Sequence, residues 1–177
     1  MCGIIGVENN KPDAIEILTQ RIQTLNLNFK VVPLQVKYPQ GAEKMLIKAI
    51  YGLEVPAGKL PLDVGVVVNN VATMTQFADW FDEGIPLIER VVTVAGSAIE
   101  RPANFIIPVG TSVREVLEFC GLNQNTQQVI MGGPMMGMPL ASLDVPVLKG
   151  TSGLLAFTEA PKGHKETLAC ISCGQCL

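Results

Sequence analysis

Three cysteines near the end of the sequence have the spacing of ligands to a metal cluster. Cys170, Cys173 and Cys176 are each separated by two residues in the segment CISCGQC. Such gaps allow three thiolates from one turn of chain to bind a corner of a cuboidal cluster, and Gly174 supplies backbone freedom and N–H groups for the sulfides. The bacterial ferredoxin pattern C-x2-C-x2-C-x3-C-P begins in the same way. We therefore expect three ligands of one [4Fe–4S] cluster, with the fourth ligand in a second motif further along.

The same thiols allow two other interpretations, a zinc site and a CxxC redox pair. Zinc motifs seldom place three cysteines at successive two-residue gaps, and a redox CxxC is expected at the start of a helix that follows a strand. Cys120 could supply a fourth ligand, but its position on the apolar face of a predicted helix favours a core thiol. Cys2 is expected to fill a strand, and His164, the only histidine, to lie in an exposed linker.

Two further segments carry polar residues where α/β domains bind ligands. Tyr38-Pro-Gln-Gly-Ala-Glu-Lys44 links a predicted strand to a predicted helix, where backbone amides suit a phosphate and the aromatic ring can flank a flat ligand. Val68-Asn-Asn-Val-Ala-Thr73 places two amides and a hydroxyl at the end of a predicted strand. Each segment also has a structural interpretation, the first as a tight turn and the second as a helix cap at Asn70.

The loop Met131-Gly-Gly-Pro-Met-Met-Gly-Met138 is apolar and rich in glycine and methionine. Methionine side chains adapt to irregular surfaces, so this composition favours a tightly turned core or a docking surface over a ligand pocket.

The composition excludes several classes of protein. Hydrophobic residues make up 48% of the 177 residues, charged residues only 16%, and the formal net charge is −3. No apolar run approaches the roughly 20 residues of a membrane span, and the acidic balance without a Lys/Arg cluster argues against nucleic acid. The N-terminus lacks the basic segment and cleavage site of a signal peptide. Five cysteines, three of them clustered, indicate a reducing compartment rather than a disulfide framework.

The first half of the chain alternates strand and helix, which predicts a three-layer α/β domain with a parallel sheet. Pro12 is expected in the first turn of a helix capped by Asn10, and Gly52 is expected to end the second helix. The expected elements are strands at Cys2–Val7, Val31–Val36 and Val64–Val68, and helices after Asn10, at Gly41–Tyr51 and from Asn70 to about Glu83.

The second half predicts a β-grasp-like α+β domain. Its elements are strands at Arg90–Gly96, Asn104–Pro108, Gln128–Met131, Val145–Leu148 and Gly153–Phe157, and a helix at Ser112–Cys120 with Val113, Val116, Leu117 and Cys120 on one face. The expected domain ranges are 1–86, 87–158 and 159–177, the last being a linker and the cysteine segment. Because the first strand starts at residue 2 and the cysteine motif stops at Leu177, we expect both ends to be cut from a longer chain.

Together these motifs resemble, in order and spacing, the C subunit family of the Rnf electron-transport complex. The match rests on five segments, which are Tyr38–Lys44, Val67-Val-Asn-Asn-Val-Ala-Thr73, Val129-Ile-Met-Gly-Gly-Pro-Met-Met-Gly137, Lys149-Gly-Thr-Ser-Gly153 and the terminal CxxCGxC. That family is related to the flavin-bearing, NADH-oxidising subunit of respiratory complex I. The resemblance implies the C-terminal half of a Rossmann-like FMN/NADH domain, then a β-grasp domain of the soluble-ligand-binding type, then the start of a ferredoxin-like segment.

The resemblance also implies a function and a set of flavin residues. NADH would deliver a hydride to FMN, and electrons would leave through 4Fe–4S clusters, or run in reverse, in ion-coupled ferredoxin:NAD oxidoreduction. The subunit would lie at the cytoplasmic face of the inner membrane, against membrane-bound subunits of the complex, with ferredoxin an indirect partner. The positions that match the complex I motifs Y-x-x-G-E-E and N-N-x-E-T are Tyr38, Gly41, Glu43, Asn69, Asn70 and Thr73.

The chain departs from the family pattern in two respects. Ala42 stands where the motif has the first glutamate of its pair, so any contact of that carboxylate is lost. The family's Gly-rich loop for the flavin phosphate lies upstream of this segment. We therefore expect this polypeptide alone to bind neither FMN nor NADH and to be inactive, with Cys170, Cys173 and Cys176 unmetallated and poorly ordered.

Two other functions are compatible with the same motifs. One is the related flavin and iron–sulfur cobalamin reductase of propanediol-utilisation compartments. The other is a non-catalytic docking module in which the β-grasp domain contacts a partner and the thiols hold zinc.

Overall fold

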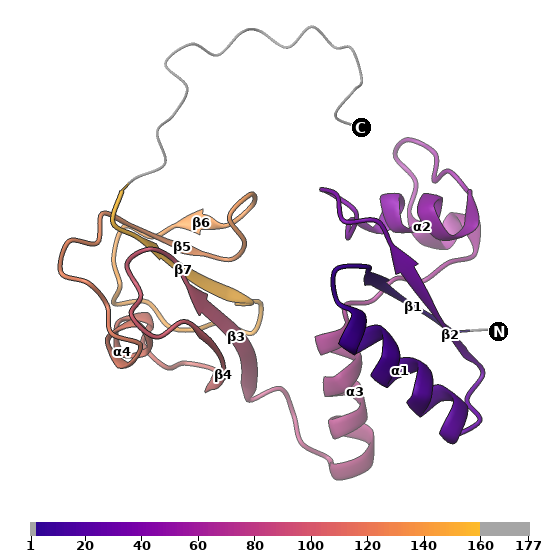
Figure 1. The fold of residues 1–177 in the computed structure, drawn as a ribbon, viewed down its shortest axis with the longest axis horizontal. Helices are drawn as coiled ribbons and strands as arrows, with labels where there is room; N and C mark the ends of the chain where they lie inside the picture. The colour runs from indigo at the N-terminus through magenta and orange to yellow at the C-terminus, as the bar shows by residue number, and fades with distance from the viewer. Residues whose placement is uncertain (1–2, 160–177) are drawn as a thin grey trace, which may run out of the picture. The chain divides into compact units, whose positions relative to one another are not determined.

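Residues 3–159 are described by a computed structural model, in which the chain divides into two units between Asn70 and Val71 (Figure 1). The N-terminal unit contains a two-stranded sheet, and the C-terminal unit contains a five-stranded sheet. The predicted combination of an α/β part followed by an α+β part is confirmed. The predicted domain boundaries after residues 86 and 158 stay predictions.

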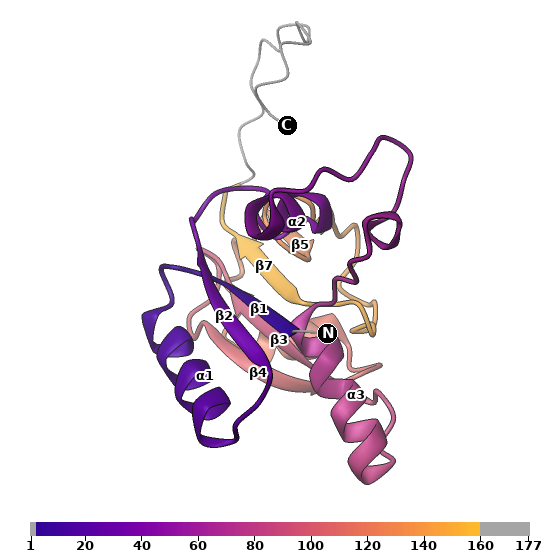
Figure 2. The same cartoon turned by 90° about the vertical axis from the view of Figure 1, so that its right-hand side faces the viewer.

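The N-terminal unit begins with a strand, a helix and a second strand. β1 (Gly3–Glu8) pairs in parallel with β2 (Phe29–Leu34), in a register that runs from Gly3↔Phe29 to Glu8↔Leu34. Parallel strands need a crossover connection, which α1 (Pro12–Thr24) supplies alongside the strand pair (Figure 2). Pro12 lies in the first turn as predicted, but the capping residue is Lys11 rather than Asn10.

The second helix of this unit packs closely against β1 at Gly6. α2 (Glu43–Tyr51) buries Ile47 to 1% exposure, and Gly52 ends the helix in the left-handed conformation, with φ of 69°. A Cβ atom on Gly6 would lie 2.9 Å from Cδ1 of Leu34 and 3.1 Å from Cδ1 of Leu46. The lack of a side chain at Gly6 therefore allows helix and strand to approach each other.

The predicted strand at Val64–Val68 is wrong. Residues Pro61–Val64 form a short 3-10 helix (η1), Gly65 follows with φ of 73°, and residues 66–70 have no regular structure. Valine favours strands, but a strand also needs a neighbour to pair with. Within the described part of this unit β1 and β2 pair only with each other, and Val67 is 71% exposed.

The C-terminal unit has a mixed sheet in the order β4-β3-β7-β5-β6. The helix α3 (Val71–Glu83) comes before it in the chain. The strands are β3 (Glu89–Ala95), β4 (Ala103–Pro108), β5 (Gln128–Met131), β6 (Met138–Pro139) and β7 (Gly153–Phe157). β3 and β7 are parallel, while the other neighbours are antiparallel. A hairpin, a helix and a parallel pair at the sheet centre constitute the predicted β-grasp arrangement.

One helix covers one face of this sheet and completes its core. α4 (Val113–Phe119) buries Val113, Val116 and Leu117, and Cys120 follows directly at 1% exposure. These are the four residues predicted to share a face. They pack with inward-facing strand residues that are themselves inaccessible to solvent, which are Val92, Val94, Leu154 and Ala156.

The predicted strand at Val145–Leu148 is also wrong, because this segment caps α4 instead. The amides of Val113 and Arg114 donate to the carbonyls of Val145 (2.9 Å) and Leu143 (3.1 Å). These bonds satisfy two donors that a helix N-terminus leaves without an intrahelical partner. Pro146 has no N–H and forms only an isolated bridge with Ser112. The additional short strand of the sheet is β6.

An ion pair joins α4 to the same capping segment. Nε of Arg114 lies 2.7 Å from Oδ1 of Asp144, and a second guanidinium nitrogen lies 3.0 Å from Oδ2. The hydrogen bond from Arg114 is the main cause that lowers the pKa of Asp144, and the charge of Arg114 adds to it. The pair is bidentate but exposed, so it orients the segment more than it stabilises the fold.

We expect Leu117→Ala to destabilise the C-terminal unit by about 2–5 kcal/mol, because it removes a fully buried side chain from a packed core. Hydrogen exchange of the β7 amides measures this loss within the full chain. The exposed neighbour Glu118 provides the control, since Glu118→Ala should change the free energy of opening by less than about 0.5 kcal/mol. Equal protection in the two variants would contradict the position of the core.

We expect Asp144→Asn to reduce stability at about pH 6 and to have little effect at about pH 2.5. The folded-state pKa of Asp144 is below its ordinary value of 3.8. The contribution of the ionised group is therefore present above that value and is lost as the pH falls through the folded-state pKa. Urea unfolding of wild type and variant at both pH values measures the difference, with the exposed Glu115→Gln as the control. A difference that persists at acid pH would rule the pair out as its cause.

Candidate functional site

The cysteines of the cluster motif lie outside the described residues. Cys170, Cys173 and Cys176 follow residue 159, and Cys2 and His164 are also outside this range. Their ligand roles stay predictions. Within residues 3–159, no group of three or more His, Cys, Asp and Glu side chains is arranged to hold a metal ion.

Cys120 is a core thiol, as predicted. It is 1% exposed and belongs to the hydrophobic cluster beneath α4. Burial raises the pKa of this thiol, against a smaller opposite effect from the charge of Arg101. Because the thiolate is the form that binds metals and attacks substrates, a thiol held in its protonated form suits packing rather than chemistry.

The segment from Tyr38 to Lys44 forms a pair of consecutive turns. The amide of Gln40 donates to the carbonyl of Lys37, and the amide of Ala42 donates to that of Pro39, both at 2.9 Å. Gln40 is only 4% exposed, so the turn is anchored in the unit, whereas Tyr38 is 59% exposed. Apart from Gly41 itself and its chain neighbours Gln40 and Ala42, no heavy atom lies within 4 Å of the position that a Cβ on Gly41 would take. The turn thus offers a bare patch of backbone close in sequence to an exposed aromatic ring.

The start of α2 adds amide groups to this turn. Ala42 is the capping residue, and no side-chain hydrogen bond caps the helix. The amides of a first helical turn can then donate to a ligand oxygen. Glu43 is the first helical residue, where its carboxylate also complements the positive end of the helix dipole. Tyr38 and Gly41 therefore lie in the turn, and Glu43 lies at the start of the helix that follows it.

The other three predicted flavin residues lie around the start of α3. Asn69 and Asn70 are exposed at the end of the irregular segment that follows η1, and Thr73 is exposed in the first turn of the helix. Because the division between the two units falls after Asn70, Thr73 belongs to the other unit. The structure places three of the six residues in the turn and at the helix start that follows it, and the shared role of all six stays a prediction.

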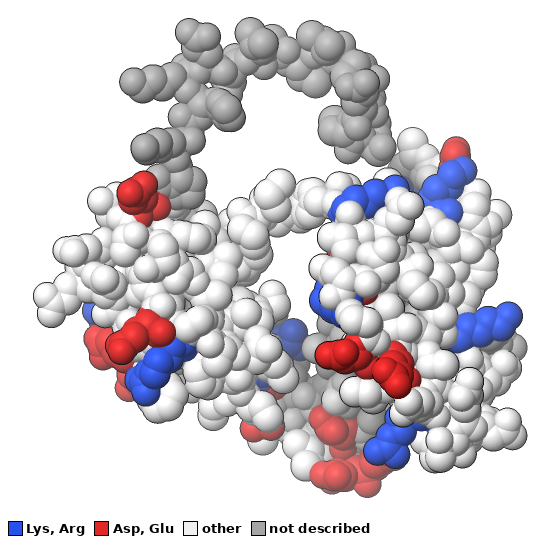
Figure 3. Space-filling model, viewed as in Figure 1, with Lys and Arg blue, Asp and Glu red and all other residues white. Residues whose placement is uncertain are grey.

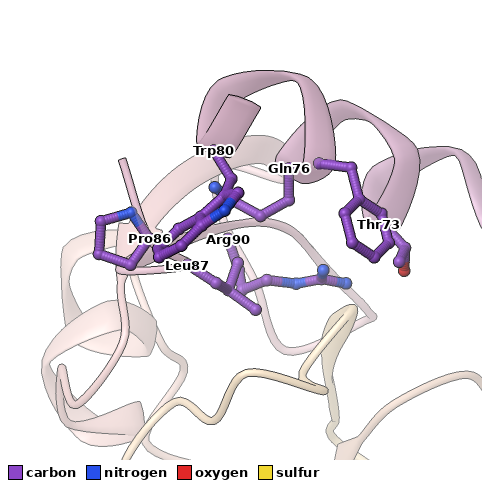
Figure 4. A pocket seen from close by; sticks show the side chains of 7 residues that line it. Thr73, Gln76, Trp80, Pro86, Leu87 and Arg90 are labelled. Carbon is purple, nitrogen blue, oxygen red and sulfur yellow. The ribbon is translucent and has the colours of Figure 1, made fainter. Parts of the chain in front are cut away.

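Sequence reasoning missed a cleft of about 360 Å³ in the C-terminal unit, shown in Figure 4. Residues from α3, from the segment after it and from the start of β3 form its walls: Thr73, Gln76, Phe77, Trp80, Pro86, Leu87 and Arg90. The spacing of Phe77 and Trp80 predicts a shared helix face. What the spacing does not reveal is that the chain after α3 folds back to meet that face.

The methionine-rich loop presents its side chains to solvent. Met135, Met136 and Met138 are 69%, 84% and 71% exposed, whereas Ile130 beneath the loop is buried. This exposure agrees with a surface loop rather than a tightly packed core segment. Its proposed use for docking stays a prediction.

Two family profiles match the chain in the order of its two units. A profile described as the Nuo51 FMN-binding domain matches residues 2–79, and a profile described as the SLBB domain matches residues 91–139. The first covers β1 to most of α3, and the second covers β3 to β6 of the β-grasp sheet.

Curated relatives match the chain across both units. It is 45% identical over 174 residues to the C subunit of the proton-translocating ferredoxin:NAD(+) oxidoreductase complex of Clostridium ljungdahlii, and 46% identical over 176 residues to the Na(+)-translocating counterpart of Acetobacterium woodii. The C subunit of the ion-translocating oxidoreductase complex of Rhodobacter capsulatus is 44% identical over 174 residues. The chain is homologous to these C subunits. The matches cover 98–99% of this chain but only 34–40% of the relatives, so this chain spans little more than a third of their length.

A solved structure has a fold similar to that of this chain. The crystal structure of an NAD+-reducing [NiFe]-hydrogenase in the air-oxidized state matches with a TM-score of 0.69 and 20% identity, over 87% of this chain and 32% of that chain. At this identity the match shows a shared fold and nothing finer. It agrees with the α/β and β-grasp arrangement described above.

The surface of the described residues carries few charges. On the face seen in Figure 3, blue and red side chains are interspersed among uncharged ones, and no broad basic patch is visible there. Among residues 3–159, no helix has both the length and the apolar character that crossing a bilayer requires.

We expect Gly41→Ala to change the stability of the N-terminal unit by less than about 0.5 kcal/mol, because open space surrounds the added methyl group. The matched variant Gly52→Ala should cost about 1–2 kcal/mol, since it forces a side chain into the left-handed region. Hydrogen exchange of the α2 amides compares the two. A large loss in Gly41→Ala would show that the turn needs glycine for its own conformation.

Proposed function

We propose that this chain belongs to an electron-transfer subunit of an ion-translocating ferredoxin:NAD+ oxidoreductase complex. The observation that carries the proposal is the 44–46% identity to C subunits of such complexes, which extends through both units in order. The match to a flavin-binding profile over residues 2–79 supports an FMN site in the N-terminal unit.

The preformed turn before α2 fits a flavin. Its bare backbone at Gly41 allows a flat ring to approach, the exposed ring of Tyr38 can pack against that ligand, and the first-turn amides of α2 can donate to its oxygens. Asn69, Asn70 and Thr73 would add amide and hydroxyl groups. A flavin held by these residues would supply a hydride acceptor for NADH and a donor of single electrons.

The role of this chain toward the flavin is to position it and shield it. Tyr38 would cover the flavin ring with an aromatic face that carries a polar tip. Glu43 keeps a carboxylate at the helix start, where it complements the helix dipole. Ala42 contributes no carboxylate to this site, which leaves Glu43 as the only acidic side chain between Tyr38 and Lys44.

The cysteine segment would receive the electrons. Cys170, Cys173 and Cys176 supply three thiolates to a [4Fe–4S] cluster, and a cysteine of another motif supplies the fourth. A cluster at this place would offer an electron carrier between the flavin and other subunits of the complex at the cytoplasmic face of the membrane. The low charge content of this chain suits a surface that rests against other subunits.

We expect the anaerobically purified protein, produced with all flanking sequence that its gene encodes, to contain flavin, iron and sulfide and to absorb broadly near about 400 nm. Cys173→Ser should lose cluster iron and keep flavin, because it removes one ligand. Gly41→Ala should lose flavin and keep iron, because its methyl group stands in the path of the ring.

Cys120→Ala is the matched control for the cysteine arm, since this thiol is buried in the core and should leave both cofactors in place. Stoichiometric zinc with neither chromophore would overturn the proposal and favour a docking module. Flavin loss in Cys173→Ser together with intact iron would show that the two sites were assigned the wrong way round.

A further inference from the structure

The aromatic cleft of the C-terminal unit is built by hydrogen bonds within a short stretch of chain. Gly84 ends α3 in the left-handed conformation, with φ of 72°, and its amide donates to the carbonyl of Trp80 at 3.0 Å. The amide of Ile85 donates to the carbonyl of Asp79, and the side-chain amide of Gln76 donates to the carbonyl of Ile85, both at 3.3 Å. These bonds fold the chain after α3 back along the helix.

The walls of this cleft are apolar and aromatic. Phe77 and Trp80 come from α3, while Pro86 and Leu87 come from the returning segment. Phe77 and Trp80 remain 49% and 54% exposed, so their ring faces are open to a ligand. The volume of about 360 Å³ falls within the range of small-molecule sites, about 300–1,000 Å³.

Arg90 is the one cation among the described residues that line the cleft. Arg90 lies on the same face of β3 as the buried Val92 and Val94. It is only partly buried, because it lies at the start of the strand, outside the hydrophobic core. In Figure 4 its side chain extends along the cleft, and its guanidinium group lies on the side of Thr73, away from Pro86.

The Nε donor of Arg90 finds no acceptor within residues 3–159. This nitrogen is buried and has no hydrogen-bond partner, and the guanidinium forms no ion pair in the same part of the chain. Nearby carboxylates exist on α3 and β3, at Asp79, Asp82, Glu83 and Glu89, but none of them lines the cleft. A buried donor without a partner is costly, and an acceptor on a ligand would satisfy it.

We propose that this cleft binds a small planar anion, with its flat ring against Phe77 and Trp80 and its carboxylate or phosphate on Arg90. Aromatic side chains bind flat rings through offset or edge contacts. The planar guanidinium group matches the two oxygens of a carboxylate or a phosphate. Gln76 is engaged in holding the returning segment, which leaves Arg90 as the charged anchor.

This site goes beyond the proposed electron-transfer function and is independent of it. Of the six flavin residues, only Thr73 lines the cleft, and the other five belong to the N-terminal unit. The proposal assigns no role in ligand binding to Thr73. The cleft can therefore fail its test while the flavin and cluster assignments stand, and the reverse also holds.

Trp80 allows a direct test, because it is the only tryptophan of the chain. Its indole N–H gives a single NMR signal from the wall of the cleft in the full 177-residue chain. We would titrate the chain with 2-naphthoate, with 2-naphthyl phosphate and with the neutral 2-naphthamide. Saturable shifts with the two anions and much weaker binding of the amide are expected. The order of the two anions tells whether the site prefers a carboxylate or a phosphate.

Two pairs of variants assign the binding groups. Arg90→Gln should weaken binding of the anions about ten-fold, whereas Lys149→Gln, which removes an exposed charge elsewhere, should change it less than about two-fold. Arg90→Lys should rank between wild type and Arg90→Gln, because it keeps the charge but loses the planar fork. Phe77→Leu should weaken binding of all three probes, whereas Phe119→Leu, at an exposed aromatic side chain of α4 outside the cleft, should not.

The outcome is decisive in either direction. The proposal is overturned by the absence of a saturable shift, by equal affinity for the neutral amide, or by an Arg90→Gln variant that binds the anions as wild type does. Unchanged backbone amide signals of β3 and β4 in Arg90→Gln would verify that the variant keeps the pairing of Arg90 with Ile107.

Discussion

The parallel pairing of β3 with β7 is the contact on which the C-terminal unit depends. The two strands meet at Thr93↔Gly153, Val94↔Leu154 and Ala95↔Leu155, and each has a further neighbour on its outer side. Gly96, with φ of 123°, lies so close to the carbonyl of Ala156 that a side chain would not fit. Because Val94 and Leu154 are fully buried beneath α4, a change in this register would expose the core. The position of Arg90 at the strand start is set by the other neighbour of β3, because Arg90 pairs with Ile107 of β4.

The N-terminal unit uses close backbone approach in a comparable way. Gly6 lets α2 lie against β1, and the buried Ile47 holds the helix there. The turn before α2 takes its position from this packing and from the buried Gln40, not from ion pairs. Both sites proposed for the molecule thus lie at the starts of elements that apolar contacts position. The amides at the start of α2 and the guanidinium of Arg90 are therefore left to form hydrogen bonds with a ligand.

The sequence pattern predicted correctly those features that depend only on residues nearby in the chain. The face of α4 followed from helical spacing, and the end of α2 followed from Gly52, since each depends on residues within a few positions. The wrong predictions concern segments whose conformation depends on contacts with residues far away in the sequence. Val66–Val68 has strand propensity but no strand beside it in the described part of its unit, and Val145 serves the N-terminus of α4 through its carbonyl, a role that side-chain identity does not signal. The cleft at Arg90 escaped prediction for the same reason, because it exists only after the chain folds back beyond Gly84.

The exposure of the methionine-rich loop has a chemical consequence of its own. Thioethers oxidise to sulfoxides, which are polar and more rigidly hydrated than the original side chain. Met136 and its two exposed neighbours would meet oxidants first, whereas Met131 is partly buried in the sheet and its sulfur lies 3.5 Å from the hydroxyl of Thr151. Oxidation of Met135 and Met136 would therefore convert an apolar tip into a polar one, whereas oxidation of Met138 would alter β6 itself, where this residue pairs with Met131. The polarity of this loop therefore depends on whether the protein has been exposed to oxidants.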